Sequence, residues 1–252
     1  MRFWRHREKR LLNGEAESAS PALQWRRSTL TSDAHGSPRT DVSLAVWHSG
    51  LMPRINALFV CTANICRSPY AEAAFNHAAR MHQIDAVAAG AGVRVDLLDV
   101  AGQPTCPEMP YDQPRPADIV IPRPAQHSAT QLDADLVRSA DLIVVFEPNH
   151  RSHVVQLQPR AQLRTYSLRQ LERLASAISA DEWPDSAPAP TGDVLRDLNL
   201  ARSWAPYRDD DTVPDPHGHG VEAHKVAANV VDDCIAALMA AIKVRHVMGS
   251  DA

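Results

Sequence analysis

The chain has 252 residues, 44% of them hydrophobic, and a formal net charge of −4. This length and composition suffice for one well-buried core and favour a single domain of about 150 to 200 residues with an extension. Its four cysteines have no regular spacing, which argues against a disulfide framework and for a reducing compartment, by default the cytoplasm.

Residues 1–53 differ in character from the rest. Up to and including Arg54, the chain holds nine Lys or Arg against five Asp or Glu, a net charge of +4, so the remainder carries −8. The apolar runs of this segment are too short for a signal peptide or a membrane span. We expect a disordered basic extension, no nucleic-acid partner and no membrane span; a basic arm that docks on membrane or nucleic acid is the alternative. Met52 is an alternative start, since it leads straight into the first expected strand.

From Arg54 onward, expected strands alternate with expected helices. The strands lie near residues 55–60, 85–89, 142–146 and 164–166, and the helices near 69–81, 134–139, 151–157, 168–178 and 221–244. This order predicts an α/β fold with a four-stranded parallel sheet and helices on both faces. The domain spans 54–247, with a tail at 248–252. Within it, residues 180–211 are rich in Pro, Asp and Ala, and we expect a mobile insertion, a candidate lid.

The loop between the first strand and the first helix carries the strongest chemical signal. Its sequence is Cys61-Thr62-Ala63-Asn64-Ile65-Cys66-Arg67-Ser68-Pro69. Ser68 and Pro69 indicate a helix N-cap and first turn. Unpaired N–H groups and the helix dipole favour a bound dianion and an ionised cysteine at such a place. Arg67 adds a planar cationic fork suited to two phosphate oxygens, so we predict phosphate chemistry.

This stretch resembles the signature of the low-molecular-weight protein tyrosine phosphatases, which place it just after their first strand. The resemblance implies a flavodoxin-like fold, Cys61 as nucleophile and Arg67 as phosphate ligand. The phosphate-binding loop would comprise Thr62, Ala63, Asn64, Ile65, Cys66 and Ser68. Ala63 stands where the family usually has Gly; if that position needs a positive φ, Ala there costs about 1 kcal/mol.

The resemblance also implies a general acid on an Asp-Pro loop before a C-terminal helix. Asp215 meets this expectation, and the prolines on either side of it would hold its carboxyl stiffly over the loop. His127 is expected to support the loop through hydrogen bonds with Asn64 and Ser68. His217 occupies the place where the family has aromatics that flank a phosphotyrosine ring, although imidazole presents less apolar surface than Tyr.

The resulting hypothesis is metal-independent hydrolysis of a phosphomonoester. Cys61 would attack phosphorus and form a cysteinyl-phosphate, while Asp215 would protonate the leaving oxygen and later activate water. Phosphotyrosyl protein is the first-choice substrate, small phosphate esters come second, and a cognate tyrosine kinase is a candidate partner. We expect no cofactor. We expect no metal either, because His217, His219 and His224 lack acidic or thiol ligands in register.

Two alternatives stay open. A thiol-coupled arsenate reductase shares this fold and loop but needs a relay of further cysteines; Cys106 is a candidate, although no close second cysteine follows it. A catalytically weak phosphate-binding or interaction protein is suggested by Ala63, by His217, and by Thr130, which replaces an Arg usual in the family.

Overall fold

The computed structural model describes residues 54–114, 119–180 and 182–250. The expected disorder of residues 1–53 and the alternative start at Met52 lie outside these residues, as do the last two residues of the tail. In the described part of the chain, no helix is long and apolar enough to cross a membrane.

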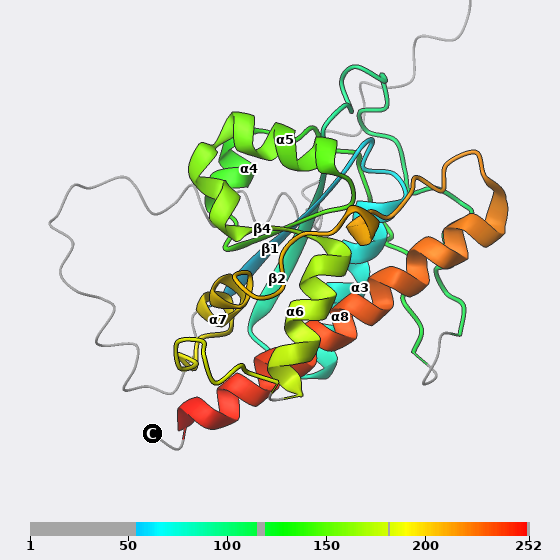
Figure 1. Cartoon of the computed structure of the whole chain (residues 1–252). Helices are drawn as coiled ribbons and strands as arrows, with labels where there is room; N and C mark the ends of the chain where they lie inside the picture. Colours follow the sequence, from blue (N-terminus) through cyan, green and yellow to red (C-terminus); the bar gives the residue numbers. More distant parts are fainter. Residues whose placement is uncertain (1–53, 115–118, 181, 251–252) are drawn as a thin grey trace, which may run out of the picture.

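A four-stranded sheet forms the centre of the molecule (Figure 1). Its strands are β1 (Ile55–Cys61), β2 (Ala86–Gly92), β3 (Leu142–Val145) and β4 (Thr165–Ser167). They are all parallel and lie in the order β2-β1-β3-β4, which confirms the predicted fold class. The chain proceeds outward from β1 in both directions, so the carboxyl ends of β1 and β3 form the switch point where α/β sheets place their ligands.

Helices cover both faces of the sheet (Figure 1). The α-helices are α3 (Arg67–Met81), α4 (Ala134–Ser139), α5 (Pro148–Leu157), α6 (Leu168–Ser179), α7 (Val194–Ala201) and α8 (Gly220–Ser250). The described residues also form two short 3-10 helices, η2 (Pro159–Arg164) and η3 (Asp209–Asp211). Several of these elements extend beyond the expected ranges: β2 continues to Gly92, α5 begins at Pro148 and α8 continues past residue 244.

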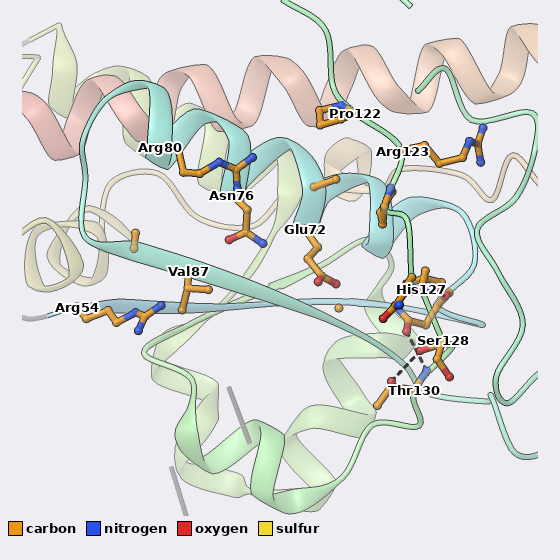
Figure 2. A pocket seen from close by; sticks show the side chains of 16 residues that line it. Arg54, Glu72, Asn76, Arg80, Val87, Pro122, Arg123, His127, Ser128 and Thr130 are labelled. Carbon is orange, nitrogen blue, oxygen red and sulfur yellow. Dashed lines mark hydrogen bonds between the residues drawn. The ribbon is translucent and has the colours of Figure 1, made fainter. Parts of the chain in front are cut away.

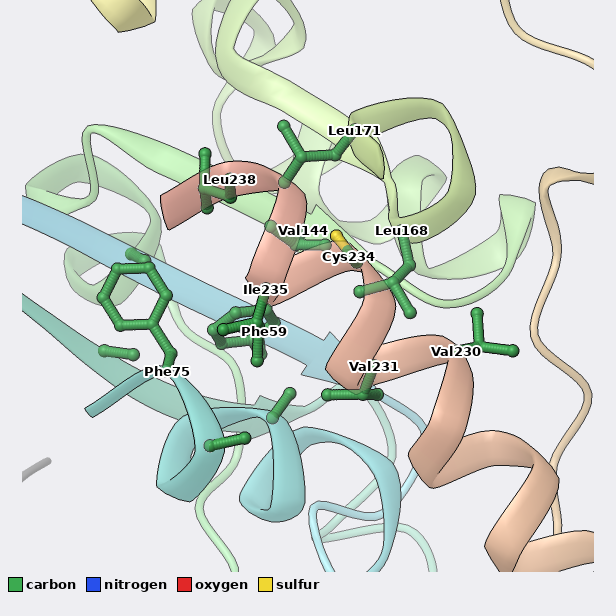
Figure 3. Close-up of a cluster of buried hydrophobic side chains, with 14 of the residues drawn as sticks. Phe59, Phe75, Val144, Leu168, Leu171, Val230, Val231, Cys234, Ile235 and Leu238 are labelled. Atoms are coloured by element: carbon green, nitrogen blue, oxygen red, sulfur yellow. The ribbon is translucent and has the colours of Figure 1, made fainter. Parts of the chain in front are cut away.

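Alternate residues of β1 supply two hydrophobic cores. Phe59 belongs to the larger core, which α3, α6 and α8 close with residues such as Phe75 and Leu171 (Figure 3). Leu58 belongs to the smaller core, under α4 and α5. Such burial on both faces explains why β1 is a nearly continuous apolar run. Cys234 of α8 packs in the larger core.

Residues 180–211 include a packed helix that the sequence pattern did not reveal. Helix α7 buries Val194 and Leu198 in the larger core. Its Asp197 is also buried and forms an ion pair with buried Arg245 of α8, with 2.9 Å between Oδ2 and Nε. Breaking a buried pair typically costs about 3–5 kcal/mol. The ion pair therefore fastens α7 to α8. That residues 180–211 move as a lid stays a prediction.

Candidate active site

The loop between β1 and α3 lies at the carboxyl edge of the sheet, against the end of β2. Gly92 pairs with Cys61 in the sheet register. A Cβ on Gly92 would lie 2.8 Å from the backbone oxygen of Thr62 and 2.8 Å from the carbonyl carbon of Ala63. Only glycine permits so close an approach. The Gly at the end of β2 therefore lets the loop lie directly on the neighbouring strand.

Asn64 is the residue around which the loop is folded. Its φ is 55°, so the left-handed conformation that the sequence analysis considered for Ala63 occurs one residue later. Asn tolerates this conformation better than most residues. The side chain is fully buried: its Oδ1 accepts the N–H of Thr130 at 2.9 Å, and its Nδ2 donates to Ser68 Oγ at 2.8 Å. The Ala at position 63 therefore does not carry the strain.

Ser68 connects Asn64 to the sulfur of Cys61. The structure corrects its expected role as helix cap, because α3 begins at Arg67 and its N-cap residue, Cys66, makes no side-chain cap hydrogen bond. Ser68 Oγ lies instead 3.0 Å from Cys61 Sγ and 3.3 Å from the carbonyl oxygen of Ala91. Since Asn64 already donates to this oxygen, the hydroxyl proton is left for the sulfur or for the carbonyl.

Cys61 is the last residue of β1, and its sulfur faces into the loop. The backbone N–H of Asn64 donates to Sγ at 3.2 Å.

His127 contacts the same loop, with Nε2 2.7 Å from the carbonyl oxygen of Asn64. Burial lowers the pKa of His127. The contact with Asn64 is thus present, made through its backbone rather than its side chain.

Arg67 opens α3 with a guanidinium that is only 1% exposed. Its Nη1 donates to the carbonyl oxygen of Val213 at 2.8 Å and to Glu147 Oε1. Its Nη2 lies 2.7 Å from Asp215 Oδ2 and 3.3 Å from Thr62 Oγ1. The fork is thus fixed on one side and faces a carboxylate that is 43% exposed on the other.

A cavity of about 240 Å³ brings most of the predicted residues together, while Asn64, Ser68 and His127 are not among those that line it. It is lined by Cys61, Thr62, Ala63, Ile65, Cys66, Arg67, Leu98, Val100, Asp215 and His217. The loop, the acid and the substrate-flanking residue of the sequence analysis therefore share one hollow. Leu98 and Val100, which the sequence analysis did not single out, add apolar wall.

A second, larger cavity of about 390 Å³ lies behind Asn64 and His127, between α3, β2 and residues 122–130 (Figure 2). Glu72 of α3 is among its lining residues, and burial raises the pKa of this carboxyl to about 8. None of the described lining residues is a cysteine. We therefore place the chemistry in the smaller cavity.

Besides Leu98 and Val100, two polar residues of the site were missed from the sequence. Glu147 comes two residues after β3, at the same sheet edge as Cys61, and binds the Arg67 fork. His150 of α5 is fully buried, with Nε2 3.1 Å from Thr62 Oγ1. For Glu147 the available signal was its place just after a buried strand, because parallel sheets bind their ligands at the carboxyl ends of the strands. His150 had no comparable signal.

The burial of His150 predicts an acid-sensitive fold. Burial, and then the charge of Arg67, lowers its pKa from 6.5 to about 3. Between these pH values the unfolded chain binds the proton and the folded chain does not, so the stability contributed by neutral His150 is lost as the pH falls below about 6.5. The expected slope is up to about 1.4 kcal/mol per pH unit.

The measurement compares urea unfolding of the wild type and of His150→Gln from pH 7 to pH 4. We expect the wild type to lose more free energy of unfolding over this range than the variant. His77→Gln on α3 controls for the loss of an imidazole and should follow the wild type. Parallel pH profiles for the wild type and His150→Gln would show that His150 does not cause the acid sensitivity.

Comparisons with known proteins identify relatives of this chain. Residues 56–178 match the family model described as low molecular weight phosphotyrosine protein phosphatase. A low molecular weight protein-tyrosine-phosphatase, Ptp of Acinetobacter johnsonii, is 31% identical over 117 residues, which is 45% of this chain and 71% of that protein.

Two solved structures share the fold. The arginine phosphatase YwlE of Geobacillus stearothermophilus superposes with a TM-score of 0.52 at 18% identity, over 77% of this chain and 96% of its own. The low molecular weight protein tyrosine phosphatase of T. tengcongensis superposes with a TM-score of 0.50 at 23% identity, over 73% of this chain and 97% of its own. At these identities the likeness concerns the fold alone.

Proposed function

Since this chain belongs to the low molecular weight phosphotyrosine protein phosphatase family, we propose that it hydrolyses phosphotyrosyl protein through a cysteinyl-phosphate on Cys61. The observation that carries the proposal is the shared cavity of Cys61, Arg67 and Asp215, with 2.7 Å between the last two side chains. These are a nucleophile, a phosphate ligand and a proton donor, the three groups that two-step phosphoryl transfer needs.

Phosphate would enter the loop in exchange for a carboxylate. The first turn of α3 offers backbone N–H groups that no helical carbonyl can satisfy. Arg67 is held from behind by Glu147 and Val213, so its Nη2 side stays aimed into the cavity. A phosphate dianion would replace Asp215 at Nη2. The displaced carboxyl, 43% exposed and on a loop, would then be available to the leaving oxygen.

The chemistry then balances in two steps. Cys61 Sγ forms a bond to phosphorus as the phosphorus–oxygen bond to the leaving group breaks, and Asp215 gives its proton to that oxygen. Water next attacks phosphorus, the sulfur–phosphorus bond breaks, and Asp215 takes a proton from the water. Inorganic phosphate and the Cys61 thiolate are released. Arg67 and the loop amides hold the equatorial oxygens through both steps.

The walls of the cavity support an aryl phosphate. Leu98 and Val100 give it apolar surface, and His217 adds an aromatic ring to the lining. Leu98 is 45% exposed, so the mouth is open enough for a residue within a protein chain. A phenyl ring gains from burial against such surfaces. We extend the proposal to a cognate tyrosine kinase as partner and to a cytoplasmic location.

A panel of phosphopeptides tests the substrate. We expect kcat/KM to be highest for phosphotyrosine and at least about 100-fold lower for phosphoserine, whose phosphate lies closer to the backbone and brings no ring to the apolar wall. Phosphoarginine belongs in the panel because a structural neighbour is an arginine phosphatase. A preference for phosphoarginine or phosphoserine would overturn the substrate and leave the loop chemistry standing.

Replacing Asp215 by Asn tests the acid. We expect hydrolysis of phenyl phosphate, which has a poor leaving group, to slow by about 10²–10⁴-fold. Hydrolysis of 4-nitrophenyl phosphate should slow much less, because 4-nitrophenolate leaves without a proton.

Asp210→Asn provides the matched control. Asp210 is exposed on η3, five residues before Asp215, and the substitution makes the same change of charge. Its rates should stay within about twofold of the wild type for both esters. An Asp215→Asn variant that slows both esters equally would contradict the role of general acid.

A further inference from the structure

At the phosphate-binding loop, three side chains from distant parts of the chain bring soft ligand atoms together. They are Cys66 before α3, Cys106 in the connection between β2 and α4, and His224 in the first turns of α8. The two sulfur atoms and Nε2 of the histidine all lie within 4.8 Å of one another. Cys106 Sγ and His224 Nε2 are 3.2 Å apart.

These three side chains are held in place by their surroundings. Each is at most 5% exposed. The backbone N–H of Cys106 donates to the carbonyl oxygen of Ile65 at 2.7 Å, which fastens its segment to the phosphate-binding loop. His224 Nδ1 lies 2.8 Å from the carbonyl oxygen of Gly220. A carbonyl only accepts, so Nδ1 carries the proton and the lone pair of Nε2 faces the sulfurs.

This orientation is the one that metal-binding histidines adopt. Ligating imidazoles usually donate their other N–H to a carbonyl or carboxylate, which fixes the tautomer. Glu108 Oε2 lies 2.9 Å from Cys106 Sγ but outside the group of three mutually close ligand atoms. Its side chain is exposed, so it can turn toward an ion as the fourth ligand. Two thiolates, an imidazole and a carboxylate form a set that suits Zn²⁺.

The spacing also suits a tetrahedral ion. Zinc binds sulfur at about 2.3 Å and histidine nitrogen at about 2.0–2.1 Å, so neighbouring ligand atoms lie roughly 3.5 Å apart. The 3.2 Å between Cys106 Sγ and His224 Nε2 is close to this separation. In the sequence, His217, His219 and His224 have no thiol ligands in register. The fold brings two thiols to His224, from positions 40 residues apart.

We propose that Cys66, Cys106, His224 and Glu108 form a Zn²⁺-binding site that ties the phosphate-binding loop to the start of α8. Binding replaces the two thiol protons by the ion, and both protons pass to solvent. Because Cys66 precedes Arg67, an ion on Cys66 restrains the first turn of α3. Cys66 belongs to the phosphate-binding loop and lines the same cavity as Cys61, so the ion would hold the loop that carries the nucleophile. Zinc binding itself does not depend on the identity of the substrate.

The test loads the full-length chain, stripped with EDTA and kept reduced, with Zn²⁺ and measures bound metal after gel filtration. We expect one ion per wild-type chain and an apparent melting temperature several degrees higher than without zinc. Replacement by Co²⁺ should give the absorption of thiolate-to-cobalt charge transfer. Cys106→Ser and His224→Ala should lose the ion and the shift in melting temperature, with circular dichroism confirming that they fold.

Matched variants separate this site from other zinc ligands. His219→Ala removes an exposed imidazole from the same region and should keep the ion. Cys61→Ser should also keep it. Glu108→Gln changes only an exposed side chain, so it stays folded and should bind zinc at least tenfold more weakly. The proposal is overturned if the wild type retains no zinc, or if Cys61→Ser loses the ion while Cys106→Ser keeps it.

Discussion

Replacing Cys61 by Ser should lower kcat for aryl phosphate hydrolysis by more than about 10⁴-fold, with no loss of fold. The loss of a nucleophile removes the covalent route, and effects up to about 10⁶-fold are known for such residues in hydrolases. Ser is nearly the same size as Cys, so the contacts of Sγ with Asn64 N and Ser68 Oγ can be kept. The measurement is steady-state hydrolysis of 4-nitrophenyl phosphate, with inorganic phosphate as competitor.

Cys234→Ala is the control for removing a thiol. Cys234 lies on α8 in the larger core and takes no part in the cavity, so kcat should stay within about twofold even if packing costs some stability. The Cys61→Ser variant should still bind phosphate, because Arg67 and the helix N-terminus remain. Equal kcat values for the wild type and Cys61→Ser would end the proposal of covalent catalysis.

Replacing Arg67 by Lys should lower kcat/KM by about 10³-fold or more, although the charge is unchanged. Arginine groups that hold a transferring phosphoryl group contribute about 10³–10⁵-fold. The Arg67 fork binds Glu147 and Val213 with one nitrogen and faces the cavity with the other. An ammonium group cannot do both in this planar geometry. The loss therefore measures orientation rather than charge.

Arg202→Lys is the matched control for this substitution. Arg202 is partly buried, donates to the carbonyl oxygens of Gln162 and Thr165, and stacks on Tyr166 on another part of the fold. Its replacement should affect stability, while kcat/KM changes by less than about threefold. If Arg67→Lys kept kcat/KM within tenfold of the wild type, the role of Arg67 would be structural.

The fold and the loop that lines the smaller cavity were predictable because their signals are local. The apolar run of β1, the helical spacing of α3 and the residues between them follow one another in the sequence, so one stretch specifies strand, loop and helix. Asp215 lies far away, yet its two prolines mark a stiff loop before an amphipathic helix. The sequence around Asp215 did not indicate that its carboxyl lies near Cys61. That placement came from the family resemblance, and the structure puts both residues in one cavity.

The details of the loop could not be predicted because several residues compete for one role. Serine is a common N-cap residue, but the hydroxyl of Ser68 forms hydrogen bonds with Cys61 Sγ and with the side-chain amide of Asn64 instead. The left-handed φ could belong to Ala63 or Asn64, and Asn64 adopts it, with Thr130 holding its side-chain oxygen.

Long-range contacts between single side chains left no trace in the sequence pattern. His150 meets Thr62 across 88 positions, and Cys106 meets His224 across 118. A lone His or Cys has the same local pattern whether it is buried in a core or part of a site. Helix α7 was missed for a related reason: its eight residues follow a stretch rich in Pro, and its packing against α6 and α8 decides its structure.

The most direct test of the account is the detection of the covalent intermediate. The wild type, mixed rapidly with a phosphotyrosine peptide and quenched in denaturant within milliseconds, should carry one phosphoryl group, located by mass spectrometry on the peptide that contains Cys61. The group should disappear on longer incubation and be absent from Cys61→Ser. A chain that hydrolyses the peptide without ever carrying phosphate, or that carries it on a residue other than Cys61, would contradict the account.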